Sequence, residues 1–446
     1  LIRPADPAYD DARAVWNAAI DRRPAAIARV ADAADVRAAL ACARAHGLPV
    51  AVRGGGHHVA GLGTVDGGLV LDLGQMRAVT VDRRARTARV EAGARLGDLD
   101  RATQEYGLAV PAGQSADTGV AGLTLGGGTG WLMRKYGLTI DNLLAVELVT
   151  ADGRLLRASA AERPDLFWGL RGGGGNFGVV TAFTYRLQPV GPIVLGGPLI
   201  YTLDRAGAAL RAYRDFMAAA PDELTAFAVF ATIPSVPPFP ERLHGRPALA
   251  IDLCYAGPLE EGEGVVAPLR AFGPPALDLV GPIPYLVRQR MLDGTAPRGR
   301  HHYSRSGYLR DLPDAVIAAL VAGFARVPSP LAQIFLARLG GAVARASEMA
   351  TAFSGRDAAY LFWILGTWPP AGTAGPNQRW VRALAAALTP HATGGVYVNL
   401  IDRDEGRERV RAAYGAATYA RLARLKAAYD PDNLFRLNHN IAPAAD

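Results

Sequence analysis

The chain carries the stretch Arg53-Gly54-Gly55-Gly56-His57-His58-Val59-Ala60-Gly61 directly after an apolar run at 48–52 that has the character of a β-strand. Three consecutive glycines beside a histidine indicate a loop whose bare backbone approaches a ligand, because glycine has no Cβ. Backbone N–H groups of such a loop converge on an anion, and Arg53 adds positive charge at the same place. The stretch therefore predicts a strand followed by a loop that binds a pyrophosphate.

Two further glycine-rich segments lie in the first half of the chain, at 111–130 and 171–178. In both, the density of glycine indicates that the backbone runs close to something flat or charged. Three such segments in one half of a chain predict a single extended cofactor.

The length and composition indicate a globular protein with two interlocked domains, because 446 residues exceed one ordinary core. The net charge of +7 comes from 48 basic and 41 acidic residues that are scattered along the chain. No run of like charges is long enough for a nucleic-acid surface, and no apolar run approaches the about 18 residues of a membrane span. We therefore expect neither a nucleic-acid partner nor membrane insertion.

The two cysteines, Cys42 and Cys254, provide neither a disulfide framework nor a metal site, and we expect both to be buried free thiols. The neighbouring His301 and His302 have no third ligand in sight, so no metal centre is predicted. We expect a bacterial cytoplasmic protein, with secretion left open because the chain begins with Leu1 rather than Met. The sequence does not indicate an oligomeric state.

Apolar periodicity and composition divide the chain into parts at 1–195, 196–392 and 393–446. The first part alternates short strands with helices, the first of which has Asp32 as its N-cap and ends at Gly47. Its expected strands lie at 26–30, 48–52, 69–73, 78–81, 88–91 and 179–187, and its expected helices at 32–47 and 96–106. In the middle part we expect strands at 199–203, 226–233, 248–255 and 360–367 and helices at 204–219, 313–326 and 378–387. The pattern predicts a second, mostly antiparallel domain with helices on one side, after which the tail returns to the first domain.

Several motifs occur in the order in which one enzyme family carries them. They are Arg53–His57, Gly119–Gly130, Arg134–Leu138, Asp165–Trp168, Gly172–Gly178, Tyr397–Asn399 and the tail at 429–440. Together they resemble the berberine-bridge-enzyme-like FAD oxidases of the vanillyl-alcohol-oxidase superfamily, over nearly the whole chain and least in the middle part. The resemblance implies an α+β fold with a two-part FAD-binding domain of the PCMH type, formed by 1–195 and 393–446. It also implies a substrate domain at 196–392 with a large antiparallel sheet covered by helices.

The resemblance implies FAD as the cofactor, attached covalently to His57 through the 8α-methyl group of its isoalloxazine. His58 departs from the Asn, Ser or Asp that the family often has at this position. In the alternative interpretation, both histidines only form hydrogen bonds with carbonyl groups of the loop. A neutral imidazole suits the attachment because it is nucleophilic near neutral pH. The residues expected to bind the cofactor are Arg53, Gly54, Gly55, Gly56, His57, His58, Gly61, Gln114, Asp117, Thr118, Gly119, Gly122, Gly127, Gly128, Asp141, Asn142, Gly174, Asn176, Val179, Tyr397, Asn438 and Asn440.

Many relatives add a second flavin link through a cysteine shortly before the Gly-Val-x-Gly segment. Here the neighbourhood is Gln114-Ser115-Ala116-Asp117-Thr118, and both cysteines lie elsewhere, so a single attachment is expected. Doubly linked members tend to have open clefts for oligosaccharides, which makes a sugar oligomer a poor candidate substrate. Thr118 falls near the family's oxygen gate, where a small side chain leaves room for molecular oxygen.

The resemblance gives Tyr397 as the catalytic base, on a strand where the tail re-enters the cofactor domain, with Asn399 orienting flavin or substrate. Tyrosine is a poor base at its ordinary pKa of about 10, so this role requires neighbours that lower the pKa. In the alternative interpretation Tyr397 only packs against the isoalloxazine.

The substrate domain offers two candidate surfaces. Along the strand at 360–368, alternation places Leu361 and Trp363 on the face opposite Tyr360 and Phe362, and one of these faces is expected to cover the flavin. The segment at 298–305 is basic and is either a contact for an acidic substrate group or a surface loop.

We therefore expect an FAD-dependent oxidase with one covalent link. It dehydrogenates a C–OH or C–N centre of a small, aromatic or polycyclic natural product and passes electrons to oxygen, which gives peroxide. The alternatives are a flavin-dependent dehydrogenase or oxidative cyclase, a flavoprotein that binds a ligand without redox turnover, and a reductase with a nicotinamide donor and non-covalent FAD.

Overall fold

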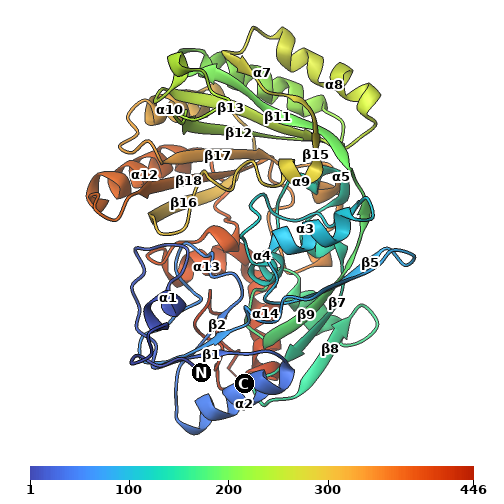
Figure 1. Cartoon of the computed structure of the whole chain (residues 1–446), viewed down its shortest axis with the longest axis vertical. Coiled ribbons are helices and arrows are strands. Elements are labelled where there is room, and N and C mark those ends of the chain that lie inside the picture. Colours follow the sequence, from blue (N-terminus) through green and yellow to red (C-terminus); the bar gives the residue numbers. More distant parts are fainter. Residues whose placement is uncertain (446) are drawn as a thin grey trace.

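The computed structural model describes residues 1–445 and consists of two lobes (Figure 1). The terminal lobe contains both ends of the chain, and the sheet lobe contains residues 193–392. The predicted α+β class and large antiparallel sheet are confirmed. The first strand of that sheet begins at Ile193, just before the boundary expected at 196.

A small parallel sheet with strand order β1-β3-β2 carries the first glycine loop. Its strands are β1 (Ala26–Arg29), β2 (Val50–Arg53) and β3 (Leu69–Asp72), and α1 (Tyr9–Arg13) and α2 (Ala33–Ala45) lie nearby. As predicted, the side chain of Asp32 accepts a hydrogen bond from the N–H of Asp35 at the start of α2, and Gly47, with φ +62°, follows its end. The glycine loop therefore leaves the carboxyl end of β2.

An antiparallel sheet of five strands forms the rest of this lobe's framework. In spatial order it contains β4 (Val79–Asp82), β5 (Thr87–Glu91), β9 (Val179–Arg186), β7 (Leu143–Val149) and β8 (Leu155–Ser159). The short strands β6 (Leu108–Ala109) and β10 (Gln188–Pro189) pair with each other. Helices α3 (Leu96–Gln104), α4 (Val120–Gly126), α5 (Met133–Tyr136) and α6 (Pro164–Leu170) connect these strands. The first half of the glycine-rich segment at 119–130, for which no helix was expected, is the helix α4.

The sheet lobe is built on an antiparallel sheet of eight strands. Their spatial order is β14 (Leu277–Asp278), β11 (Ile193–Thr202), β13 (Pro247–Tyr255), β12 (Leu224–Thr232), β17 (Gln333–Arg338), β18 (Tyr360–Trp368) and β16 (His301–Leu309), and β15 (Gly281–Pro284) also pairs with β11. Strand β17 was not predicted from the sequence, and most of the segment at 298–305 belongs to strand β16 rather than to a surface loop. Helices α7 (Leu203–Ala219), α8 (Leu259–Ala271), α10 (Asp314–Phe324) and α12 (Ala374–Leu388) cover the outer face, at the top of Figure 1. The short helices α9 (Tyr285–Arg288) and α11 (Ala342–Arg345) lie in connections.

The two faces of this sheet belong to different hydrophobic cores. Tyr360 and Phe362 of β18 pack in one core with helices α7, α10 and α12, whereas Leu361 packs in another core with residues of the terminal lobe such as Trp131. Because side chains alternate along a strand, neighbouring strands repeat this division. The inner face of the sheet is therefore directed toward the terminal lobe.

The tail completes the terminal lobe through α13 (Gly406–Tyr414), α14 (Ala416–Tyr429) and the extended segment that follows. In α14, Lys426 is fully buried and donates to Asp430 Oδ2 (2.6 Å), to the Asn176 carbonyl (2.9 Å) and to the Phe435 carbonyl (2.9 Å). The buried ammonium thus holds the last segment against the third glycine cluster.

Two predictions about single residues are wrong. Cys42 is exposed on α2, because it lies on the face of the helix away from Val36 and Leu40, and only Cys254 is buried. Tyr397 precedes a turn of 3-10 helix at Val398–Leu400 and does not lie on a strand. No helix within residues 1–445 is long and apolar enough to cross a membrane, and these residues contain no cluster of three or more potential metal ligands.

Candidate functional site at the junction of the lobes

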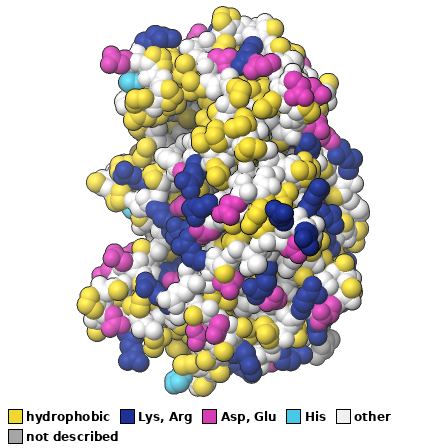
Figure 2. Space-filling model, turned by 45° about the vertical axis from the view of Figure 1, so that its right-hand side comes forward, with side chains coloured by type: hydrophobic (Ala, Val, Ile, Leu, Met, Phe, Trp, Pro, Cys, Tyr) yellow, Lys and Arg dark blue, Asp and Glu magenta, His cyan; other side chains and the backbone are white. Residues whose placement is uncertain are grey.

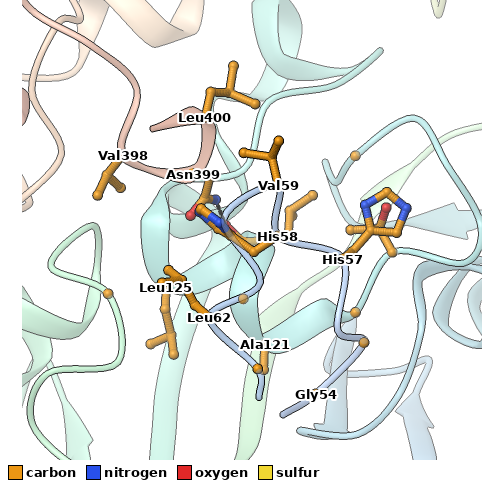
Figure 3. Close-up of a pocket in the computed structure, with 18 of the residues that line it drawn as sticks. Gly54, His57, His58, Val59, Leu62, Ala121, Leu125, Val398, Asn399 and Leu400 are labelled. Carbon is orange, nitrogen blue, oxygen red and sulfur yellow. Dashed lines mark hydrogen bonds between the residues drawn. The ribbon is translucent and has the colours of Figure 1, made fainter. Parts of the chain in front are cut away.

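A cavity of about 410 Å³ lies between the two lobes, and its walls come from widely separated parts of the chain. The glycine loop after β2, helix α4, the third glycine cluster and the tail form the walls on the terminal lobe. Strands β12, β17 and β18 form the roof. Figure 3 shows the glycine loop and α4 on one side of this cavity and Val398, Asn399 and Leu400 on another.

The first glycine loop and the segment before α4 are in direct backbone contact. A Cβ on Gly55 would lie 2.4 Å from the nitrogen of Gly119, and a Cβ on Gly119 would lie 2.3 Å from the nitrogen of Gly55. Real Cβ atoms do not approach so closely, so both positions require glycine. These two glycines serve the contact between the loops as well as the cavity wall.

Other glycines leave open space at the cavity. A Cβ on Gly122, in α4, or on Gly175, in the third cluster, would meet nothing within 4 Å, and both residues line the cavity. Because these two glycines have no side chains, the space beside them is open to a ligand and is not filled by other protein atoms.

His57 is held at the cavity wall by two neighbours, Asp117 and Trp16. Its Nε2 is hydrogen-bonded to Asp117 Oδ1 at 3.1 Å, and its ring stacks on Trp16 with centroids 4.7 Å apart. Trp16 in turn stacks on His302, at 3.7 Å. In Figure 3 the ring of His57 points away from His58 and Asn399. The imidazole of His57 therefore has a fixed orientation.

Asp117 connects this histidine to the sheet lobe. It also accepts hydrogen bonds from Ser115 Oγ (3.0 Å) and from Arg298 Nε (3.0 Å), and Arg298 donates as well to the carbonyl of Gly55. Partial burial alone would raise the pKa of Asp117, but the hydrogen bonds and charges of His57, Ser115 and Arg298 outweigh it and hold the pKa below its ordinary value. Asp117 is therefore an ionised carboxylate that only accepts hydrogen bonds.

His58 forms a second, separate histidine contact. Its Nδ1 accepts from the N–H of Ala60, and its Nε2 lies 3.1 Å from Nε2 of His439 in the tail. Burial lowers the pKa of His58 to about 4 and that of His439 well below its ordinary value, so both rings are neutral near neutral pH. His58 thus ties the glycine loop to the tail.

Tyr397 and Asn399 form a polar pair beside the end of helix α4. The phenol oxygen of Tyr397 accepts from Gly128 N–H (2.8 Å) and from Asn399 Nδ2 (2.9 Å), which also donates to the Leu123 carbonyl. The expectation of a lowered pKa is wrong: burial raises the pKa of Tyr397 to about 12, although both donors act to lower it. Near neutral pH Tyr397 is a phenol, and its own proton has no acceptor within the described residues.

The roof of the cavity is apolar and aromatic. Phe335 of β17 and Trp363 of β18 stack with centroids 5.6 Å apart, and Phe227, Ala337 and Leu361 extend the same surface. On the strand at 360–368, the face that covers the cavity is the one that carries Leu361 and Trp363.

The residues present fit the predicted FAD. Backbone from the first and third glycine segments borders the cavity, where N–H groups suit a pyrophosphate. Arg53 at the start of the loop pairs through Nη2 with Asp72 at 2.9 Å, and its buried Nη1 has no partner within residues 1–445. Asn438 donates from Nδ2 to the carbonyls of Gly175 and Phe435, which leaves its buried Oδ1 without a partner at the cavity wall. A buried acceptor of this kind is normally satisfied, and FAD carries hydroxyl donors that suit it.

Most of the predicted site residues line this cavity. They are Arg53, Gly54, Gly55, Gly56, His57, His58, Gln114, Thr118, Gly119, Gly122, Gly174, Asn176, Tyr397, Asn399 and Asn438.

The other predicted residues lie behind the wall. Asp117 supports His57, as described above. Gly61 (φ +65°) packs on Ile20, and Gly127 and Gly128 pack on Phe353 and Thr139. Asp141 pairs with Arg356, and Asn142 donates to the carbonyls of Tyr136 and Leu138. Val179 is buried in β9, and Asn440 does not reach the cavity.

Several residues of the cavity wall were not predicted from the sequence. Trp16 precedes the first motif by many positions, and Leu292, Thr295 and Ala296 come from the connection before β16. No local pattern marks these positions. For Phe227 and Phe335, the alternation of their strands would have been a usable signal.

Comparison with known proteins matches this architecture. Residues 24–159 match the family described as FAD binding domain, and residues 396–442 match the family described as berberine and berberine like. The chain is 33% identical to the uncharacterized FAD-linked oxidoreductase YgaK of Bacillus subtilis, over 98% of this chain and 95% of that protein. It is 31% identical to (R)-6-hydroxynicotine oxidase of Paenarthrobacter nicotinovorans, over 99% of this chain and 96% of that protein.

Among solved structures, 6-hydroxy-D-nicotine oxidase from Arthrobacter nicotinovorans superposes with a TM-score of 0.89 and 29% identity, covering 99% of this chain and 97% of that chain. Sequence, fold and cavity agree, and the chain belongs to the berberine-bridge-enzyme-like FAD-linked oxidoreductases.

Proposed function

We propose that this enzyme is an oxidase that carries FAD on a single covalent link to His57 and transfers electrons from a small aromatic substrate to molecular oxygen. One observation carries the proposal: the cavity places the fixed imidazole of His57 at one wall and the Tyr397–Asn399 pair under an aromatic roof at another. Both cysteines lie outside the cavity wall, which supports a single attachment.

When bound, FAD supplies a hydride acceptor for the carbon that is oxidised. The aromatic roof formed by Phe335 and Trp363 holds a flat substrate and excludes water from it. The phenol of Tyr397, already held by two donors, directs its free proton to a substrate oxygen or nitrogen and so positions the reacting carbon.

The charge of the cavity narrows the substrate class. Within residues 1–445, Arg53 is the one lining residue with a permanent charge, and it lies at the glycine loop, where it suits the cofactor. The roof carries no charged side chain, so a charged substrate group would be buried there without a partner. These features support a neutral aromatic or polycyclic substrate with a C–OH or C–N centre. By its name, one relative is an oxidase of 6-hydroxynicotine, a small heteroaromatic compound with C–N bonds, which agrees with this class.

The basic segment at 298–305 is not a contact for an acidic substrate in this proposal. Arg298 is engaged with Asp117 and Gly55, Arg305 pairs with Asp404, and His302 stacks on Trp16. Figure 2 shows basic and acidic side chains interspersed on one face of the molecule, as expected for a solvated surface.

Acid precipitation tests the covalent link, since flavin should stay on the wild-type polypeptide and should be released from His57→Ala. Release from the wild-type protein would refute the covalent assignment. For the reaction, flavin reduced by light under anaerobic conditions should be reoxidised rapidly on mixing with oxygen, and peroxide should accumulate. Slow reoxidation would favour a dehydrogenase of the same fold.

A further inference from the structure

The hydrogen bond between His57 and Asp117 has a defined donor and a defined acceptor. Because Arg298 and Ser115 help keep Asp117 ionised, its Oδ1 is an acceptor, and the hydrogen in this bond belongs to Nε2 of His57. In a neutral imidazole with its hydrogen on Nε2, the lone pair lies on Nδ1. An orienting acceptor thus decides which nitrogen of a histidine is the nucleophile.

We propose that Asp117 is a positioning residue for the attachment of FAD: it presents Nδ1 of His57 as the nucleophile and compensates the positive charge that develops on the imidazole. This inference rests on the proposed covalent link through His57. Arg298 belongs to the sheet lobe, so that lobe takes part in the attachment by orienting Asp117 and the Gly55 carbonyl.

The atoms and electrons of the attachment balance as follows. A bond forms between Nδ1 of His57 and the 8α-carbon of the flavin, and one C–H bond at that carbon breaks with loss of a proton. The two electrons of the C–H bond pass through the flavin to molecular oxygen. Oxygen leaves as hydrogen peroxide with two protons, one from the 8α-carbon and one from Nε2 of His57. Asp117 lies at the second of these protons, 3.1 Å from Nε2.

The test compares Asp117→Asn with a matched control, Asp293→Asn. Asp293 accepts hydrogen bonds from Ser115 Oγ (3.2 Å) and Ala116 N–H (2.7 Å) in the same loop, but it makes no hydrogen bond or ion pair with His57. Asn at 117 keeps the size of the side chain and one acceptor oxygen, but it loses the charge and has an amide donor in place of the second carboxylate oxygen. The control therefore loses charge beside the loop and keeps the carboxylate that touches the imidazole.

Two quantities are measured for each purified protein in air-saturated buffer: total FAD per chain, and the fraction that stays with the polypeptide after acid precipitation, followed over time. We expect Asp117→Asn to bind FAD and to attach it about 10- to 100-fold more slowly than wild type, the usual effect of removing the partner that orients a histidine ligand. Asp293→Asn should attach FAD at the wild-type rate.

Three results would overturn the proposal: attachment by Asp117→Asn at the wild-type rate, an equal defect in Asp293→Asn, or an Asp117→Asn protein that binds no FAD, since the carboxylate would then serve cofactor binding. A wild-type protein without covalent flavin would instead refute the proposed link itself, so the two failures are distinguishable.

Discussion

Replacing Tyr397 by Phe removes one oxygen and keeps the ring. The structure gives the size of the effect on stability, because two donors, the buried Gly128 N–H and the partly buried Asn399 Nδ2–H, lose their acceptor. An unsatisfied buried donor costs about 1–3 kcal/mol and the partly buried amide about 1 kcal/mol, so the free energy of unfolding should fall by about 2–4 kcal/mol. Tyr308→Phe is a matched control, because the buried hydroxyl of Tyr308 has no partner in residues 1–445 and its loss should cost nothing.

The same variant tests the role of Tyr397 in catalysis. As a positioning phenol it contributes one hydrogen bond to the substrate, so anaerobic stopped-flow reduction of the flavin should slow by about 10- to 100-fold. Because burial raises the pKa of Tyr397 to about 12, the phenol persists throughout the neutral range, and the wild-type reduction rate should not follow its titration between about pH 6 and about pH 9.

Two results would refute this reasoning. If Tyr397 were the base, only the small phenolate fraction would act, and the wild-type rate would rise about tenfold per pH unit toward the pKa. Equal urea stability of Tyr397→Phe and wild type would refute the two hydrogen bonds on which the estimate depends.

Three further predictions concern the walls of the cavity. Lys426→Met leaves the buried carboxylate of Asp430 without its cation and should lower the free energy of unfolding by about 3–5 kcal/mol, as urea titration of the FAD-free protein would measure; a loss below about 1 kcal/mol would contradict it. Gly122→Ala should raise the free energy of unfolding of FAD-free protein by about 0.5–1 kcal/mol and weaken FAD binding. Gly119→Ala should destabilise the fold, because its Cβ would lie 2.3 Å from the backbone nitrogen of Gly55. Equal effects of the two variants on urea stability would contradict this contrast. Proteolysis of the denatured protein should yield one flavin-bearing peptide, the one that contains His57, and a second such peptide in the mass spectrum would contradict a single attachment.

The glycine motifs illustrate what a sequence can predict. Residues of all three clusters line the cavity, as expected for an extended ligand site. They did not indicate that Gly122 faces the cavity while Gly128 packs on Thr139, since a residue without a side chain carries no pattern of its own. Helix α4 was not predicted because glycine has a low helix propensity, which tertiary contacts overcome here.

The chemistry of the site was harder to predict than its location. The resemblance placed Tyr397 and Asn399 together, and the structure does bring them together. The raised pKa of Tyr397 depends on burial by segments distant in the sequence, which no local motif encodes. Likewise, the contact between Asp117 and Arg298 joins residues on different lobes, and neither position has a neighbour that signals the other.

The wall of the cavity runs from Trp16 to His439, so it is complete only when nearly the whole chain has been synthesised. At about 5–20 residues per second, a ribosome reaches His439 roughly 20–80 seconds after His57. During that interval the glycine loop has neither its roof nor its tail. A nascent chain that lacks the roof and the tail should therefore not bind its cofactor. The flavin content of a cell extract should then report only chains in which the whole cavity wall is present, and truncated chains should contain no flavin.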